Sequence, residues 1–428
     1  MFDHEPIAAC ITPWGHGAVS VVRVSGPDLA RRLEPVCGPL PPAQRARHVH
    51  FRDADGVFDD GLVVSFPAPR SYTGEHVVEL SCHGNPLLVE RLLRAIGARP
   101  ARPGEFTRRA FVNGKVDLAR AEAVMQVIAA TSRRGLDGAR AALEGTLSAA
   151  LKALREPLAE TAAELEAILD YPGEDLLFES DGALVERLRA VAGGALAMAA
   201  SERAGRFAVL GARVVLAGPP NAGKSSLFNA LLERDRAIVS PAPGTTRDSI
   251  EAAWQLDGAR VTLVDTAGER DTTDVIEVQG VRRAAAERAE ADLVLHCVPL
   301  HQPGAFPPAG PAELCVGTFA DLPRLRHGPL AVSAHTGEGL ELLRAAILGA
   351  LGIEDAGARP LLASARVAAM CRQVAEHVAA AAVALPEAGP AAAAECIYAA
   401  IEALDEGTGA GVREEVLDRL FAKFCVGK

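Results

Sequence analysis

The feature that most constrains the fold is a Gly-x-x-x-x-Gly-Lys-Ser octet that runs from Gly218 to Ser225. An apolar, strand-like run at 212–217 precedes the octet, and a helix-like run follows it. In that context the backbone N–H groups and the helix N-terminus face anionic phosphates, Lys224 supplies a positive charge, and Ser225 can ligate Mg²⁺. The octet therefore predicts a phosphate-binding loop (P-loop) between a strand and a helix of an α/β sheet.

Further motifs follow the octet in an order that is typical of nucleoside triphosphatases. They are Gly-Thr-Thr-Arg-Asp at 244–248, Asp-Thr-Ala-Gly at 265–268 after a strand-like run, and Ser-Ala at 333–334. Such a series is not expected by chance. It predicts an enzyme that hydrolyses a nucleoside triphosphate.

Two of these motifs carry candidate groups for Mg²⁺ and the γ-phosphate. Thr246 lies in a loop rich in Gly and Pro, and its hydroxyl can complete the Mg²⁺ shell beside Ser225 when the γ-phosphate is present. A threonine that only caps its own loop is the structural alternative. Asp265 ends a strand, where a carboxylate can hold a Mg²⁺-bound water, and Gly268 can offer its N–H to the γ-phosphate.

The residue that orients the attacking water is left open by these motifs. Small G proteins place a glutamine after Asp-x-x-Gly, whereas this chain has Glu269, and a second carboxylate, Glu277, follows later. Either can be a solvated helix charge. No arginine finger is visible, so the compensating charge must have another source. The side chain of Asn221 and the backbone carbonyls of 240–244 can surround a monovalent cation, because proline keeps its C=O group.

The base-reading motif is degenerate. Guanine recognition normally uses Asn-Lys-x-Asp after a strand, and the corresponding stretch here is Thr-Phe-Ala-Asp at 318–321. Asp321 can still accept from guanine, Phe319 can stack on the base, and Thr318 is too short to reproduce the asparagine contacts. Because 333–334 can donate a backbone N–H to the base carbonyl, we expect GTP to be preferred over ATP.

Hydrophobic periodicity changes along the chain and predicts an α/β multidomain protein. Residues 1–115 mix short strand-like runs with Gly and Pro turns, whereas 116–210 have the apolar spacing of helices, with prolines such as Pro157 at breaks. Residues 211–352 alternate strand and helix patterns, as a doubly wound nucleotide fold requires. Residues 353–428 return to helix, so we expect one discontinuous helical domain with a nucleotide domain inserted in it.

Composition excludes several classes of protein. The net charge of −11 argues against non-specific binding of nucleic acid by the whole molecule. The eight cysteines are dispersed without metal-ligand spacing, which argues against a zinc or disulfide framework. We expect a cytoplasmic protein without a membrane span, because the N-terminus has no signal-peptide pattern and the apolar runs are short.

Outside the nucleotide domain, specific segments resemble the MnmE (TrmE) family of tRNA-modification GTPases. They are Arg-Ser-Tyr-Thr-Gly-Glu at 70–75 with Glu79 and His83 beyond it, the stretch 103–122, and the terminal Phe-Cys-Val-Gly-Lys at 424–428. Together with the inserted nucleotide domain, they extend the resemblance over essentially the whole chain.

The resemblance implies an N-terminal folate-binding domain that dimerises, a discontinuous helical domain and an inserted Ras-like G domain activated by K⁺. It also implies a homodimer that forms a heterotetramer with the FAD-binding partner MnmG (GidA). The expected activity is GTP hydrolysis coupled to addition of a carboxymethylaminomethyl or aminomethyl group to C5 of the wobble uridine of certain tRNAs. The expected one-carbon donor is 5-formyl- or 5,10-methylene-tetrahydrofolate.

The resemblance also implies residue roles. Glu277 is the catalytic carboxylate, and the folate contacts are Arg23, Glu79, Lys115 and Lys428. The Mg²⁺ ligands are Ser225 and Thr246, and the K⁺ ligands are Asn221, Ser240, Ala242 and Thr245. The residues expected to bind GTP are Asn221, Ala222, Gly223, Lys224, Ser225, Ser226, Ser240, Pro241, Ala242, Pro243, Gly244, Thr245, Thr246, Asp265, Thr266, Ala267, Gly268, Asp321, Ser333 and Ala334.

The chain departs from the family pattern at Thr318 and Phe319, at Ser240, and at the two prolines of the potassium loop. These departures bear on nucleotide affinity and on cation activation. Two alternatives stay open: a folate-binding scaffold with a weakly active G domain, and a ribosome-assembly GTPase of the Era type. The role of Cys425, in the shared tail, is also open.

Overall fold

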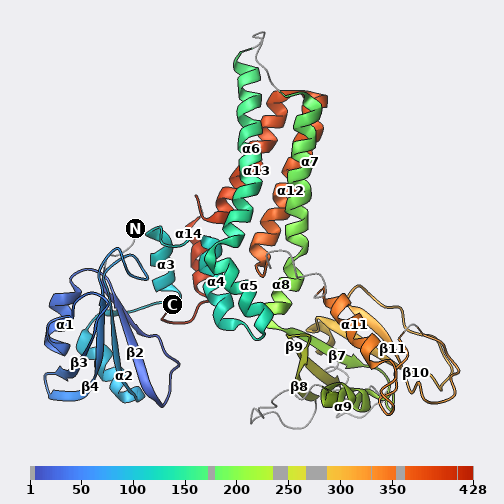
Figure 1. Ribbon diagram of the computed structural model, residues 1–428, viewed down its shortest axis with the longest axis horizontal. Helices are drawn as coiled ribbons and strands as arrows, with labels where there is room; N and C mark the ends of the chain where they lie inside the picture. The colour runs from blue at the N-terminus through green and yellow to red at the C-terminus, as the bar shows by residue number, and fades with distance from the viewer. Residues whose placement is uncertain are drawn as a thin grey trace. The chain divides into compact units, whose positions relative to one another are not determined.

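A computed structural model describes residues 5–171, 179–234, 249–266, 287–328, 330–352, 362–411 and 413–427. The chain divides into two compact units, each described separately below (Figure 1). The N-terminal unit comprises Met1–Ala121 and Asp405–Lys428, and the central unit comprises Glu122–Leu404. The predicted α/β multidomain class is confirmed. The domain boundaries near 115, 210 and 352 stay predictions.

The N-terminal unit is built on a six-stranded sheet in the order β3-β4-β5-β2-β1-β6. All described pairings are antiparallel except that of β1 with β6, which is parallel. The strands are β1 (Ile7–Cys10), β2 (Gly17–Ser25), β3 (Ala46–Asp53), β4 (Gly56–Phe66), β5 (Val77–Gly84) and β6 (Arg99–Pro100).

The two faces of this sheet differ in chemistry. Helices α1 (Leu29–Cys37) and α2 (Pro86–Ile96) pack with the buried alternate residues of β2 and β5 in one apolar core. The intervening residues, Arg23 on β2 and Glu79 on β5, point to the opposite face because side chains alternate along a strand. Helix α3 (Glu105–Val112) supplies Phe106 to the core of that second face.

Long helices form much of the central unit. They are α5 (Arg133–Glu144), α6 (Thr146–Asp170), α7 (Asp181–Ala200), α8 (Glu202–Leu210) and α12 (Ala365–Ala388), while α4 (Leu118–Ala129) and α13 (Pro390–Thr408) each span a division between the units. Helices α6, α7, α12 and α13 lie side by side (Figure 1). Their Ala- and Leu-rich buried stripes explain why these segments are helical.

One expectation about these helices is wrong. Pro157 lies inside α6 and does not break it. An interior proline costs about 3 kcal/mol. Burial of Leu154, Leu158 and Leu165 on the same helix offsets that cost, at about 1.5–3 kcal/mol for each leucine. The hydroxyl of Thr161 also donates to the Pro157 carbonyl oxygen at 2.8 Å.

The nucleotide part of the central unit is a five-stranded sheet in the order β11-β10-β7-β9-β8. Its strands are β7 (Ala212–Ala217), β8 (Ser249–Leu256), β9 (Ala259–Thr266), β10 (Leu293–Pro299) and β11 (Glu313–Thr318). Only β8, at one edge, is antiparallel to its neighbour. Helices α9 (Lys224–Arg234) and α11 (Leu340–Leu351) pack with this sheet, and the carboxyl ends of the parallel strands share one edge, where ligands bind in such folds.

Candidate functional site

The P-loop joins β7 to α9, as the octet predicts. Gly218 and Gly223 both have positive φ, and a Cβ at Gly218 would lie 2.5 Å from the carbonyl oxygen of Cys297 on β10. Only glycine therefore fits at the first position of the octet. Asn221 also adopts a left-handed conformation, with φ of 61°. The backbone thus turns tightly around the space where phosphates bind in such loops.

Lys224 is held within this loop. Its side chain is buried, and Nζ donates to the carbonyl oxygens of Gly218 and Pro219 at 2.9 and 3.0 Å. Those contacts hold the ammonium group within the loop. Ser225 and Ser226 follow in the first turn of α9 and are exposed.

Asp265 lies near the end of β9, paired in register with Leu216 of β7. It is buried, and its Oδ1 atom has no hydrogen-bond partner among the residues that the structure describes. A buried carboxylate oxygen without a partner is costly. Its chemistry fits a Mg²⁺-bound water as the missing donor. The adjacent Thr266 hydroxyl donates to the Leu216 carbonyl and links the two strands.

The degenerate base motif makes an unexpected contact with the P-loop. Thr318, at the end of β11, is buried, and its hydroxyl donates to the carbonyl oxygen of Ala222 at 2.7 Å. Although its side chain is short, Thr318 therefore connects the end of β11 to the P-loop. The next residue, Phe319, has φ of 59°, and its ring lies so near Gly223 that a Cβ there would be 3.2 Å away. The Phe319 ring also meets His301 edge-on, with centroids 4.8 Å apart.

Asp321 is exposed and hydrogen-bonded to Ser333. The hydrogen bond from Ser333 lowers the pKa of Asp321, which favours its charged form. Ser333 is in turn fixed by backbone N–H groups of His335 and Thr336, which donate to its Oγ at 3.2 and 3.1 Å. Ala334 follows it in the same loop, so the structure brings the base-reading candidates together.

Several predicted site residues lie outside the described part of the chain. They are Ser240, Pro241, Ala242, Pro243, Gly244, Thr245, Thr246, Ala267, Gly268, Glu277 and Lys428, and the alternative carboxylate Glu269 lies there too.

In the N-terminal unit, Arg23 and Glu79 are directly opposite each other on β2 and β5. Arg23 donates from Nε and Nη2 to Glu79 Oε1 at 2.9 and 2.7 Å. Its guanidinium lies 5.0 Å from the ring centroid of Tyr72 and 5.7 Å from that of Phe106. Its Nη1 is buried and has no hydrogen-bond partner within the described residues. The pair therefore offers an unused N–H donor beside a carboxylate, a combination that suits a polar heterocycle.

Lys115 contacts the loop that carries Tyr72. Its Nζ donates to the carbonyl oxygen of Pro69 at 3.0 Å, and its stem lies against Gly74, where a Cβ would be 3.2 Å from Lys115 Cγ. Lys115 and the Arg23–Glu79 pair thus border the same loop, although they come from distant parts of the sequence.

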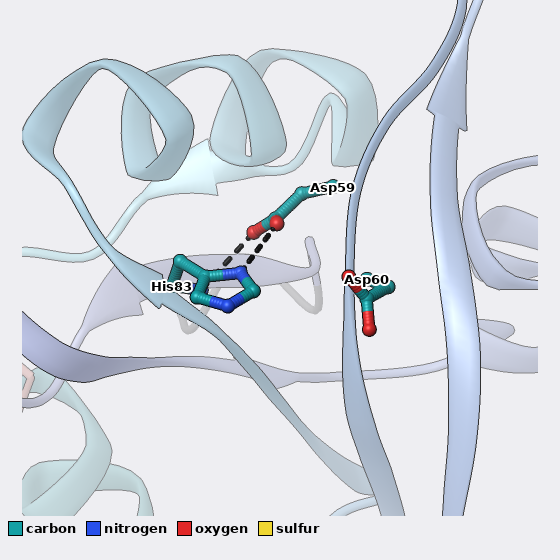
Figure 2. A group of neighbouring side chains, drawn as sticks. All are labelled: Asp59, Asp60 and His83. Carbon is teal, nitrogen blue, oxygen red and sulfur yellow. Dashed lines mark hydrogen bonds and ion pairs between the residues drawn. The ribbon is translucent and has the colours of Figure 1, made fainter.

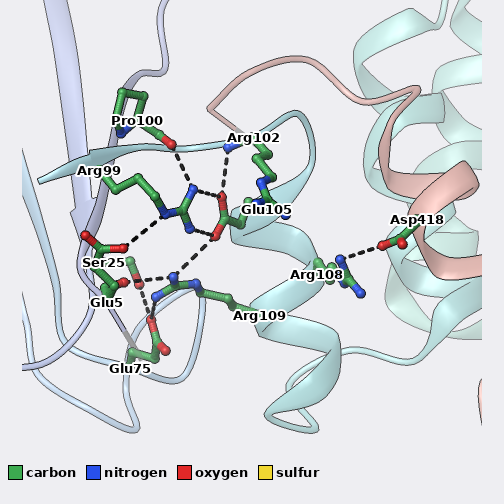
Figure 3. Close-up of polar contacts among 10 residues, drawn as sticks. All are labelled: Glu5, Ser25, Glu75, Arg99, Pro100, Arg102, Glu105, Arg108, Arg109 and Asp418. Atoms are coloured by element: carbon green, nitrogen blue, oxygen red, sulfur yellow. Dashed lines mark hydrogen bonds and ion pairs between the residues drawn. The ribbon is translucent and has the colours of Figure 1, made fainter. Parts of the chain in front are cut away.

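A buried ionic network that sequence reasoning missed supports this loop (Figure 3). Glu75 accepts from Ser25 at 2.8 Å and from Arg109 at 2.9 Å, and Arg109 also pairs with Glu105 at 3.3 Å. Burial alone raises the pKa of Glu105, but hydrogen bonds from Arg99 and from a backbone N–H outweigh burial and lower it. Glu105 and Arg109 are four residues apart on α3, whereas Ser25 and Glu75 are distant from them in sequence and meet them only through the packing of α3 in the folded unit.

The C-terminal tail packs on the N-terminal unit. Helix α14 (Glu414–Phe421) is tied to α3 by an ion pair of Arg108 with Asp418 at 2.7 Å (Figure 3). The N–H of Gly104 donates to the Cys425 carbonyl at 3.4 Å, and a Cβ at Gly427 would lie 2.8 Å from the Cys10 carbonyl on β1. The last residues before Lys428 therefore run beside the first strand of the sheet.

Comparisons with known proteins identify relatives of this chain. Residues 6–115 match the family model described as the GTP-binding protein TrmE N-terminus, and 118–425 match that of the MnmE helical domain. A tRNA modification GTPase MnmE from Alkalilimnicola ehrlichii is 42% identical over 99% of both chains. One from Thermus thermophilus is 43% identical over 99% of both. The chain belongs to the MnmE family of tRNA modification GTPases.

Family membership establishes a GTP hydrolase that acts in tRNA modification. A solved G domain of the Thermotoga maritima FeoB iron transporter matches 32% of this chain and 98% of its own, with 26% identity and a TM-score of 0.25, too low to support an argument. None of the described helices is both long and apolar enough to cross a membrane.

Proposed function

We propose that this MnmE-family chain couples K⁺-activated GTP hydrolysis to one-carbon transfer from tetrahydrofolate. With an FAD-dependent partner of the MnmG type, it would add a carboxymethylaminomethyl or aminomethyl group to C5 of the wobble uridine of certain tRNAs. The observation that carries the folate part is the Arg23–Glu79 pair, with a buried and unused Nη1 beside Tyr72. The proposed setting is a cytoplasmic homodimer joined to that partner.

In the folate site we assign the residues separate tasks. Glu79 Oε2, which takes no part in the bonds from Arg23, accepts from pterin N–H groups, and Arg23 Nη1 donates to a pterin acceptor. Because Arg23 is buried against Tyr72 and Phe106, it cannot follow a long flexible tail. We therefore assign the folate carboxylates to Lys115, which is near the surface, and to Lys428. When bound, the folate supplies the one-carbon unit.

In the G domain, Lys224 and the P-loop N–H groups would bind the phosphates, Ser225 and Thr246 would hold Mg²⁺, and Asp265 would accept from a Mg²⁺-bound water. Glu277 orients the attacking water. Asn221, Ser240, Ala242 and Thr245 would hold K⁺, which would supply the positive charge that an arginine finger supplies in other GTPases, an effect worth about 10³-fold or more in rate. Hydrolysis should accordingly be much faster in KCl than in NaCl, and equal rates would contradict the K⁺ assignment.

The folate assignment is tested by calorimetry of 5-formyltetrahydrofolate with the full chain. Glu79→Ala should weaken binding about 10- to 100-fold, because a charged hydrogen bond contributes about 1.5–3 kcal/mol. Glu90→Ala, an exposed carboxylate on α2, is the matched control and should bind normally. GTP hydrolysis should persist in both variants. Absence of binding to the unaltered chain would remove the folate chemistry and leave the GTPase in place.

A further inference from the structure

A group of nitrogen and oxygen ligands lies on β3, β4 and β5, apart from both sites described above. Asp59 and Asp60 are on β4, and His83 is near the end of β5 (Figure 2). One ligand atom from each of these residues lies within 4.8 Å of the other two. His48 on β3 joins them, because its Nε2 is 2.7 Å from Asp60 Oδ2. One imidazole and two carboxylates therefore converge from two neighbouring strands, and His48 flanks Asp60 from the third.

The local backbone explains how consecutive aspartates reach one place. In a regular strand Asp59 and Asp60 would point to opposite faces. The β3–β4 register shifts next to Asp59, where Phe51 pairs with Asp59 but Arg52 pairs with Val57, so β4 carries an extra residue. A bulge of this kind re-aims side chains.

The Asp59–His83 contact also orients the ligands. The Asp59 side chain is 6% exposed, against 65% for His83. Asp59 receives the His83 backbone N–H at 3.0 Å and contacts its Nδ1 at 2.7 Å. Asp59 thereby holds the His83 ring in a set orientation next to the two carboxylates. His83 has the same strand parity as Glu79, which places His83 on the same sheet face, roughly 13 Å along β5 at about 3.3 Å per residue.

We propose that Asp59, Asp60 and His83 form a binding site for a divalent transition metal of the Zn²⁺, Co²⁺ or Ni²⁺ type, with His48 hydrogen-bonded to Asp60 beside it. Imidazole nitrogens favour these ions over Mg²⁺ and Ca²⁺, which prefer oxygen ligands alone. Three side-chain ligands and a water complete the tetrahedral coordination that Zn²⁺ adopts when one position stays open. Such an ion would tie β4 and β5 together next to the proposed folate face.

The test is calorimetric titration of Zn²⁺ into the full chain after chelator treatment, with GDP and Mg²⁺ present so that the nucleotide site is occupied. We expect binding that is weakened at least about 10- to 100-fold by His83→Ala and by Asp60→Asn, the range seen when groups around a metal are removed. His16→Ala, an exposed histidine of the same unit outside the cluster, should bind Zn²⁺ like the unaltered protein.

A second measurement separates metal binding from a purely structural role. Zn²⁺ should raise the Tm of the unaltered chain and of His16→Ala but not that of His83→Ala, whatever the metal-free Tm of each. Co²⁺ bound to the chain should show the visible absorption of four-coordinate cobalt. The proposal is overturned if His83→Ala and Asp60→Asn bind Zn²⁺ as tightly as the unaltered chain. It is also overturned if Zn²⁺ does not change the Tm of the unaltered chain.

Discussion

The hydrogen bond from Thr318 to the P-loop can be removed by mutation to test whether the altered base motif contributes to GTP affinity. Thr318→Val keeps the shape of the side chain but removes the donor that reaches the Ala222 carbonyl at 2.7 Å. Both groups are buried, so the carbonyl would be left without a partner, at a cost of about 1–3 kcal/mol. If the whole cost appears in binding, GTP affinity falls about 5- to 150-fold.

The assay is a fluorescence titration with a labelled guanine nucleotide, accompanied by a thermal melt. Thr318→Ser keeps the hydroxyl and is the matched control, so it should bind within a few-fold of the unaltered chain. A one-kcal/mol loss should also lower Tm by about 2–4 °C in a unit of this size. Normal affinity and Tm in Thr318→Val would refute the view that this hydroxyl braces the P-loop.

Two further predictions concern ionic contacts. Arg213 on β7 binds both Glu251 at 2.7 Å and Glu287. Glu287 directly follows residues 267–286, which include the proposed catalytic carboxylate Glu277. We expect Glu287→Gln to lower kcat of GTP hydrolysis several-fold with GTP affinity unchanged. Glu251→Gln, which removes the other partner of the same arginine, should have little effect. Equal kcat values in the two variants would argue that Glu287 does not anchor the segment before it. The pKa of Glu105 is lowered in the folded protein, so its stabilising contribution is complete above its usual value of about 4.5 and is lost as pH falls through the lower folded value. Tm measured against pH should therefore fall less steeply below about pH 4.5 in Glu105→Gln than in the unaltered chain, and parallel curves would contradict this assignment.

Much of the nucleotide site could be predicted from sequence because its signals are local. The octet contains the glycines that its backbone needs: Gly218 has a φ of 145° and a strand carbonyl where its Cβ would be. Asp265 was expected at a strand end, and it lies there. For the folate candidates, resemblance named Arg23 and Glu79, but nothing in the sequence showed that they contact each other.

The sequence by itself determined most helices and strands and the family. This is because alternating patterns, turn residues and ordered motifs each span only a few residues and can be recognised without knowing the fold. Tertiary structure decided which distant groups meet. The contact of Thr318 with Ala222 spans β11 and the P-loop, the Arg23–Glu79 pair depends on strand register, and Pro157 stays helical because leucine burial outweighs a local penalty. Strand register and packing are collective properties of the folded chain, and so these contacts could not be read from local sequence patterns.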